Sequence, residues 1–406
     1  KQAGKWDQET IVSFFLCQYC SGEYLLLDEE IMEPFWIWQQ ADWPHFRWRD
    51  SEILPRLRHA QRRLGMLIGS HSRLGNSDQT LDTLLANIIS SSAIEGERLN
   101  AQSVRSSLAR RLGGSETPSY PVSDRSEGLA AMMLDAIDNH GQPLTIERLY
   151  QWHRWLFPAN EWSVQPVNVG QLRGDEPMQV VSGRVDRPTV HFEAPPRATL
   201  DDQLAEFIPW FNQTRHDPTM DPLLRAAIIH FWFVTLHPVD DGNGRLTRAL
   251  TDLALSQADS QSIRLYAMSV AILERRDHYY RALESAQRGP LDITSWICWF
   301  LDTLDYAIEL ALQVIDRSLA KAHFWLRHCH DSLSPEQTKV INRLLDGGQQ
   351  GFENGINASQ YQKVAGVSKA TATRHLAQLV DRGCIEKLPG GGRNTRYQIQ
   401  GVRMSV

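Results

Sequence analysis

The chain has 406 residues, which is too long for one ordinary domain and predicts two to four. Hydrophobic residues make up 42% and charged residues 22%, so wholesale disorder, a collagen repeat and a small disulfide scaffold are excluded. The 42 Lys and Arg against 48 Asp and Glu give a formal net charge of −6, which excludes a chain-wide basic surface for nucleic acid. Five scattered cysteines favour a reducing cytoplasm, and no apolar run is long enough to predict a membrane span.

The N-terminal part divides at Met32, which opens a coherent segment. Residues 1–31 are interpreted as an extension of uncertain origin: a tag, an upstream extension or a native arm. Residues 32–75 are expected to form an N-terminal helical segment, with a capped helix over 50–70. An amphipathic helix is predicted over 79–95.

The central part alternates helical periodicity with one short β region. Two apolar pieces flank Ser182-Gly183-Arg184, which is typical of a β-hairpin. Helical patterns are predicted at 125–139, 145–157, 199–213, 221–236, 243–257, 265–285 and 291–328.

The last segment, residues 331–406, changes character. Three helical patterns precede two strand-like pieces joined by a glycine-rich loop, which is the order of a winged helix-turn-helix. The segment has ten Lys and Arg against six Asp and Glu, in a chain that is acidic elsewhere. It is expected to bind DNA or a protein, and the two alternatives stay open. The groups it would offer to DNA are Ser368, Lys369, Thr371, Thr373 and Arg374 on the third helix, and Arg393 and Arg396 on the wing.

The run from His237 to Arg248, HPVDDGNGRLTR, carries the clearest chemical signal. Gly242 and Gly244 permit backbone conformations that other residues resist, so their amide groups can converge on an anion. A helix that begins near Asn243 would place the positive end of its dipole at the same point.

Charged side chains complete this run. Arg245 and Arg248 share one helical face, and two guanidinium groups beside a helix N-terminus predict a polyphosphate site. Asp241 adds a hard oxygen ligand suited to Mg²⁺, and His237 can act as a general base near neutral pH. The alternative is a helix-capping loop with solvated arginines, which the number of matching residues in order disfavours.

The run resembles the Fic (filamentation induced by cAMP) family motif HPFx(D/E)GNGRxxR, with Val239 where Phe is usual. The resemblance implies a mainly α fold: an all-helical Fic core over 76–320 with a β-hairpin flap, beside the small α+β winged-helix domain. Fic enzymes mostly transfer AMP from ATP to a Ser, Thr or Tyr hydroxyl of a target protein. The resemblance therefore implies a protein adenylyltransferase with ATP as substrate and Mg²⁺ or Mn²⁺ as cofactor.

The resemblance also implies individual roles. His237 would take the hydroxyl proton, and Asp241 would hold the metal. The nucleotide would be held by Gly242, Asn243 and Gly244 near the α-phosphate, Arg245 at the α/β region, Arg248 at the γ-phosphate, and Tyr279 and Tyr280 near the base and ribose.

A second run, Ser91 to Gly96, places Ser91 and Glu95 on one helical face. By itself it reads as a polar helix end with Gly96 as the C-cap. It also resembles the inhibitory motif (S/T)xxxE(G/N) of the Fic family, in an inhibitory helix near 80–96. That resemblance implies that Glu95 pairs with Arg248 in the space needed by the γ-phosphate.

The hairpin at 177–192 resembles the Fic flap, along which a target protein would dock by strand pairing. The element before it, Gly170 to Arg173, resembles a family element in which Arg173 is structural. The expected partners are ATP, the target and the chain itself through self-AMPylation; a homodimer stays open. Two alternative functions remain: removal of AMP by a water that Glu95 activates, and a DNA-binding regulator.

Overall fold

The computed structural model describes residues 12–13, 36–71, 77–112, 120–158, 167–184, 187–258, 265–346, 352, 354–389 and 395–400. Helices dominate these residues and strands are few, so the predicted mainly α class is confirmed. Internal contacts divide the chain into two units, Lys1–Glu309 and Leu310–Val406. The division falls within one long helix, and the predicted domain boundaries stay predictions.

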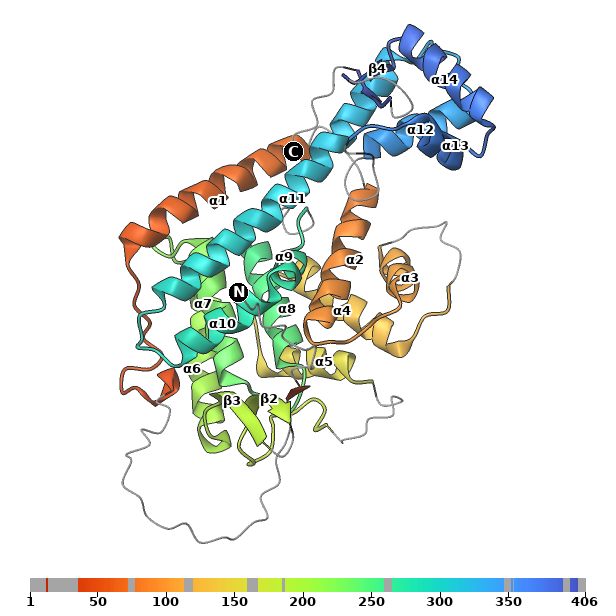
Figure 1. The fold of residues 1–406 in the computed structure, drawn as a ribbon. Coiled ribbons are helices and arrows are strands. Elements are labelled where there is room, and N and C mark those ends of the chain that lie inside the picture. The colour runs from red at the N-terminus through yellow and green to blue at the C-terminus, as the bar shows by residue number, and fades with distance from the viewer. Residues whose placement is uncertain are drawn as a thin grey trace. The chain divides into compact units, whose positions relative to one another are not determined.

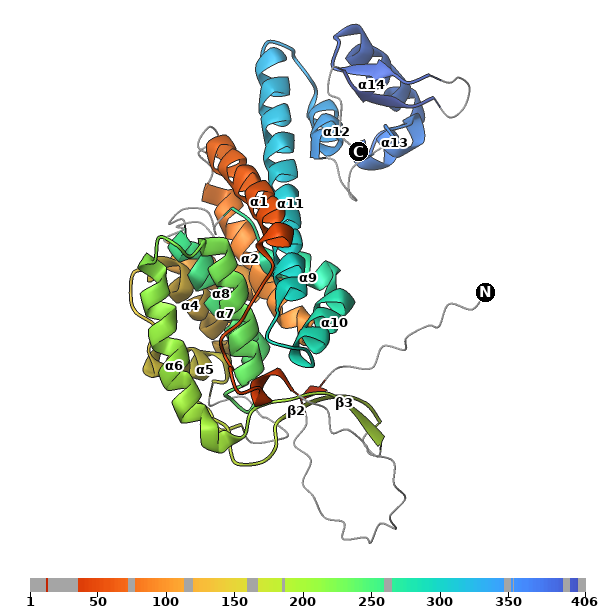
Figure 2. The same ribbon diagram turned by 90° about the vertical axis from the view of Figure 1, so that its left-hand side faces the viewer.

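The first unit is a layered helical body (Figures 1 and 2). Its helices are α1 Asp50–His71, α2 Ser77–Ile94, α3 Ala101–Arg111, α4 Asp124–Asp138, α5 Ile146–Leu156, α6 Leu200–Gln213, α7 Pro222–Leu236, α8 Asn243–Ala258, α9 Met268–Glu274, α10 Arg276–Gln287 and the first part of α11 Thr294–Arg327. The stretch predicted as one helix over 265–285 is two helices that meet at Arg275. The periodicity did not predict α3, which begins where the side chain of Asn100 accepts from two backbone N–H groups.

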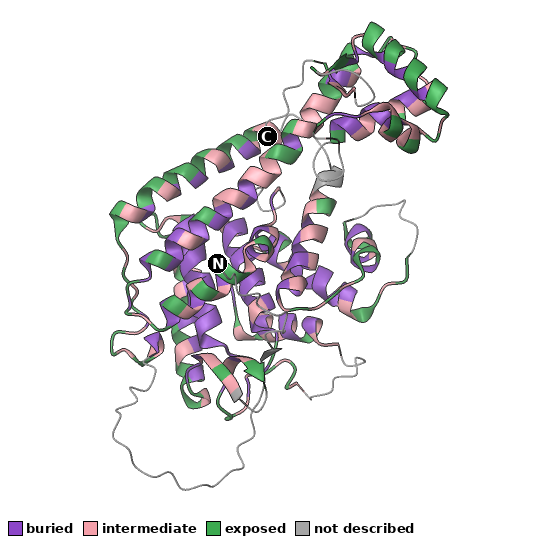
Figure 3. Ribbon diagram, in the orientation of Figure 1, coloured by how far each residue is buried: buried purple, intermediate pink, exposed green. Residues whose placement is uncertain are grey.

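Helices α7 and α8 form the centre of this unit. Every residue of α7 from Leu223 to Leu236 is buried, as the colouring of Figure 3 shows. A helix that is apolar on all sides is stable only when other elements surround it. Because α7 packs closely against α8, the loop from 237 to 242 is fixed at both ends by rigid elements.

The predicted hairpin is present as β2 Gln179–Arg184 and β3 Arg187–Glu193, which pair antiparallel with a bulge between Val180 and Val181. A short strand, β1 Val12–Ser13, pairs with the other edge of β2. The base of the hairpin packs on the N-terminal segment, where Trp36 meets Phe192 edge to face at 5.4 Å. This contact ties the hairpin to the residues that precede α1.

The second unit contains α12 Pro335–Asp346, α13 Ala358–Ala365 and α14 Lys369–Asp381, followed by β4 Ile385–Lys387 and β5 Tyr397–Ile399. The strands pair antiparallel, so the element order is the one expected from the sequence. Arg396, expected on the wing to contact phosphate, donates instead to the carbonyl of Gly355 at 2.9 Å. Arg393 lies outside the described residues. The winged-helix assignment, and DNA or protein as its partner, stay predictions.

No described helix combines the length and the apolar character that crossing a membrane requires.

Candidate functional site

His237 sits at the C-terminal end of α7 with a left-handed backbone, φ 48° and ψ 56°. It is the one non-glycine residue with positive φ in the described part of the chain, and such strain is concentrated at functional sites. Its Nδ1 lies 3.1 Å from the carbonyl of Val234, which can only accept, so Nδ1 carries the proton. Burial lowers the pKa of His237 to about 4. The ring is therefore neutral, with Nε2 left to accept a proton.

Arg173 holds this strained turn from the side of the hairpin. Its Nε donates to the carbonyl of His237 at 2.9 Å, and its Nη2 donates to the carbonyl of Pro195 just after β3. Its backbone N–H donates to the carbonyl of Pro238 at 3.0 Å. Burial lowers the pKa of Arg173 to about 10. Arg173 thus connects the turn at His237 to the end of the hairpin.

The loop itself is braced by Asn243. Its side-chain amide accepts from the backbone N–H of Val239 at 3.0 Å and donates to the carbonyl of the same residue at 2.7 Å. Val239, which stands where the family motif has Phe, is still buried. Gly242 has φ 85° and lies against Leu156 and Phe157, where a Cβ would be crowded. In this geometry the Asn243 side chain shapes the loop; its predicted contact with phosphate stays a prediction.

The N-terminus of α8 carries the groups expected to bind phosphate. Arg245 and Arg248 are both almost fully buried. Nε of Arg245 and Nη1 of Arg248 are buried N–H donors with no hydrogen-bond partner in the described part of the chain. Such donors are rare in native interiors and indicate a missing acceptor. Oxygen atoms of a polyphosphate would supply it.

Asp241 lies at the exposed mouth of this site. Its side chain is 52% exposed, and Oδ1 lies 3.5 Å from Nη2 of Arg245. Oδ1 also accepts from the backbone N–H of Gly242 at 2.5 Å. A carboxylate in this position can reach a cation held between phosphate oxygens.

Ser91 and Glu95, from the end of α2, lie against Arg248. Nε of Arg248 donates to Oγ of Ser91 at 2.8 Å, and Nη2 donates to the Ser91 carbonyl at 2.8 Å. Nη2 also lies 2.8 Å from Oε1 of Glu95. A Cβ at Gly244 would overlap this Oε1, so the Glu95 carboxylate rests on the N-terminal turn of α8. The structure brings together the three residues of the predicted inhibitory contact.

Gly96 ends α2 in the predicted way, with φ 79°. The N–H of Glu97 donates to the carbonyl of Ser92 at 3.0 Å, which is the 6→1 bond of a Schellman cap. From α10, Nε of Arg276 and Oη of Tyr280 both donate to the carbonyl of Ile94, at 2.8 and 3.2 Å. The end of α2 is therefore held in place by its own cap and by α10.

The two tyrosines predicted near the base and ribose lie in different surroundings. Tyr279 is buried among aromatic rings, 5.4 Å from Trp299 between ring centroids, and its hydroxyl lies 3.0 Å from Nε2 of His230. Burial raises the pKa of both Tyr279 and Tyr280. Tyr280 is half-buried beside the end of α2. The structure thus places Tyr279 in the core, and contact of either ring with a nucleotide stays a prediction.

Sequence reasoning missed His153 of α5. Its Nδ1 accepts from the N–H of Gly170 at 3.0 Å, and its Nε2 lies 3.1 Å from the carbonyl of Asp241. Burial lowers the pKa of His153 to about 4, so the ring is neutral and Nε2 carries the proton. Nothing in the pattern around a single histidine on a helix would have indicated this link to the loop.

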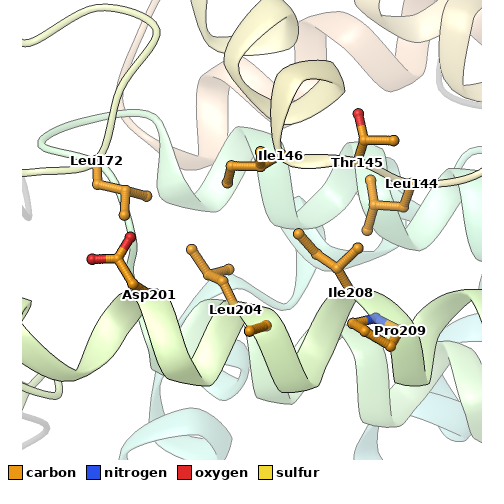
Figure 4. A pocket seen from close by; sticks show the side chains of 9 residues that line it. Leu144, Thr145, Ile146, Leu172, Asp201, Leu204, Ile208 and Pro209 are labelled. Atoms are coloured by element: carbon orange, nitrogen blue, oxygen red, sulfur yellow. The ribbon is translucent and has the colours of Figure 1, made fainter.

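A hollow lies between α6 and the start of α5 (Figure 4). Leu204 and Ile208 of α6 face Leu144 and Ile146 across it, with Asp201 at one end. None of the residues that line it belongs to the predicted site. This hollow is therefore separate from the residues predicted to bind nucleotide.

Two family models match the chain. Residues 143–255 match the Fic/DOC family, and residues 36–113 match a domain of unknown function, DUF4172. The first match includes the whole run from His237 to Arg248, and the second includes Ser91, Glu95 and Gly96 as well as the N-terminal segment.

Relatives support the first match. The protein adenylyltransferase fic-1 of Caenorhabditis elegans is 25% identical over 258 residues, 62% of this chain and 45% of the relative. The protein adenylyltransferase Fic of Drosophila yakuba is 26% identical over 229 residues, 55% of this chain and 41% of the relative. The chain thus spans less than half the length of these two relatives.

Among solved structures, a Fic family protein from Desulfovibrio desulfuricans G20 is similar with a TM-score of 0.49 and 20% identity, over 86% of this chain and 97% of that one. That score is too low to establish a common fold by itself. The similarity to Fic proteins rests on the family model and on the named relatives. Residues 143–255, which hold the complete run from His237 to Arg248, match the Fic/DOC family, the same family that the motif resembles.

Proposed function

We propose that this chain is a protein adenylyltransferase, which moves AMP from ATP to a Ser, Thr or Tyr hydroxyl of a protein target. The observation that carries the proposal is the pair of buried, unpartnered N–H donors on Arg245 and Arg248, beside the N-terminus of α8. A polyphosphate matches both the charge and the missing acceptors. Two relatives named protein adenylyltransferase support the same reaction.

His237 is the proposed general base. The hydroxyl oxygen of the target attacks the α-phosphorus, the new O–P bond forms, the bond from that phosphorus to the bridging oxygen breaks, and pyrophosphate leaves. Nε2 of His237 accepts the hydroxyl proton. The proton of the neutral ring is on Nδ1, which donates to the carbonyl of Val234, so Nε2 is unprotonated. Arg173 keeps the ring in place by holding the carbonyl of the same residue.

Asp241 is the proposed ligand for Mg²⁺ or Mn²⁺. Its carboxylate is exposed at the mouth of the site, within 3.5 Å of Arg245, and hard oxygen ligands suit both ions. A divalent cation bound there would neutralise charge on the phosphate oxygens. Asp241 and Arg245 would together orient that end of the nucleotide.

Glu95 is the proposed inhibitor in the described state. Its carboxylate covers the N-terminal turn of α8 and pairs with Arg248, which the γ-phosphate would need. One carboxylate thus takes the place of a phosphate at the same guanidinium. ATP bound beside it would have a displaced γ-phosphate and a misaligned α-phosphate.

The hairpin is the proposed docking site for the target. Arg288, at the end of α10, covers the free edge of β3. It donates to the β3 carbonyls of Val190 at 2.7 Å and His191 at 3.3 Å. A target segment would therefore pair with β2, along the edge that β1 uses in this structure. Self-modification would follow if a segment of the chain itself presents a hydroxyl there.

The test is AMP incorporation from labelled ATP into the purified chain and into a mixed protein extract. We expect incorporation with Glu95→Gly and none with Glu95→Gly/His237→Ala, while calorimetry shows that the double variant still binds ATP. Equal incorporation by both variants would refute the role of His237. Failure of both to bind ATP would refute the proposed function.

A further inference from the structure

Glu97, two residues after the proposed inhibitory glutamate, makes a second contact between the end of α2 and α8. Its Oε2 lies 2.8 Å from Nη1 of Arg245, whose side chain is only 5% exposed. Glu95 and Glu97 thus reach Arg248 and Arg245, which lie three residues apart on α8. Each arginine that is proposed to bind phosphate already has a carboxylate from the same turn.

The contacts around Arg245 leave little room for a further anion. Nη1 faces Glu97, Nη2 faces Asp241 at 3.5 Å, and Phe157 lies beneath the guanidinium with its ring centroid 5.2 Å away. Nε has no partner in the described part of the chain. A phosphate that uses the outer edge of this guanidinium must displace Glu97 from Nη1.

Glu97 has another cation to stay with after such a displacement. Its Oε1 accepts from Nε of Arg125, whose Nη1 is anchored on the carbonyl of Leu156 at 3.0 Å. Releasing Arg245 would therefore not leave a half-buried carboxylate unpaired, which would be costly. This shared arrangement lowers the cost of exchanging Glu97 for phosphate at Arg245.

We propose that Glu97 is a second inhibitory carboxylate, which competes with the α/β region of the polyphosphate for Arg245. This inference rests on the proposed function. It differs from the Glu95 contact in its arginine and its phosphate, and the two carboxylates are joined by the cap at Gly96. Removing Glu95 alone leaves Arg245 partly neutralised, so ATP affinity remains below its maximum.

Glu97→Gln tests the proposal, because it removes the charge and keeps the size. In a Glu95→Gly background it should tighten ATP binding about threefold to tenfold, measured by calorimetry, and leave adenosine binding unchanged. Adenosine lacks phosphates, so it separates competition at Arg245 from a general change in the pocket.

Glu127→Gln in the same background is the matched control. Glu127 also bridges two arginines, Arg110 and Arg111, but neither of them is proposed to bind phosphate, so its removal should leave ATP affinity unchanged. Thermal melts of all variants monitor folding.

Three outcomes decide the matter. In the Glu95→Gly background, tighter ATP binding with Glu97→Gln but not with Glu127→Gln supports the proposal. Unchanged or weaker ATP binding overturns it, and weaker binding would mean that Glu97 orients Arg245 for phosphate. If no variant binds ATP, the proposed function fails. That result differs from ATP binding with an affinity that Glu97→Gln does not change.

Discussion

Arg248 on α8 is held by both oxygens of Ser91 on α2, the side-chain hydroxyl through Nε and the carbonyl through Nη2. The carbonyl contact does not depend on any side chain of α2. Replacing Glu95 should therefore leave Arg248 in position, with its freed N–H groups facing the N-terminal turn of α8. This is why loss of one active-site carboxylate is expected to raise activity rather than collapse the site.

Asp241→Asn should raise the Mg²⁺ concentration needed for half-maximal AMP transfer by at least about tenfold, since the proposed metal ligand loses its charge. The measurement is a Mg²⁺ titration of the Glu95→Gly variant with and without this change. Identical titration curves would remove Asp241 from the metal site.

The acid limb of the rate profile should report His237. Its pKa is lowered to about 4 by burial, and the base must be neutral to accept a proton. For Glu95→Gly, kcat/KM should stay level from pH 7.5 to about 5 and fall only as the pH approaches that value. An acid limb centred near 6.5, the ordinary pKa of histidine, would contradict this reading.

Three of the buried histidines, those whose pKa is lowered, should also make the fold less stable in acid. The pKa is lowered to about 4 in His153, about 3 in His230 and about 4 in His237, so the unfolded chain binds more protons below pH 6.5. Stability should therefore fall as the pH drops from 6.5 towards 4. Asp252 acts in the opposite sense, because burial raises its pKa to about 7 and the folded chain gains that proton first.

Asp252→Asn checks the sign of the Asp252 effect. Without the compensating carboxyl group, the melting temperature should fall more steeply between pH 7 and 5 than in the wild type. A shallower fall would show that protonation of Asp252 does not stabilise the folded chain.

Arg173→Lys should reduce stability, since an ammonium cannot span the carbonyls of His237 and Pro195 as a guanidinium does. Loss of these buried contacts should lower the free energy of unfolding by about 2–4 kcal/mol and the melting temperature by about 5–10 °C. The control is Arg281→Lys, whose exposed guanidinium donates to the carbonyl of Asp277 within α10. Equal melting temperatures for both variants would exclude the structural role of Arg173.

The sequence predicted the elements whose signals are local. The apolar run of α7, the stop at Pro238 and the glycines of the loop follow from chain chemistry, and the hairpin follows from the turn at Gly183. The split at Arg275 could not be predicted, because helical periodicity continues across it.

The parts of the site that the sequence did not indicate depend on contacts between distant segments. His153 and Glu97 meet the α7–α8 region from α5 and from the loop after α2, and neither lies in a distinctive pattern. Tyr279 was expected near the nucleotide because of the resemblance, whereas packing against the Trp299 ring places it in the core. Contacts between segments far apart in the sequence, rather than residue type, determine where these side chains lie.

The most direct test of the account compares self-modification by the wild type, Glu95→Gly and Glu95→Gly/Arg248→Ala with labelled ATP. A charge-assisted pair to arginine contributes about 1.5–3 kcal/mol, so Glu95→Gly should transfer AMP roughly tenfold to a hundredfold faster than the wild type. The double variant should lose that gain, because it lacks the Arg248 guanidinium that would bind the γ-phosphate. If Glu95→Gly were no faster than the wild type, the inhibitory role of Glu95 would be contradicted.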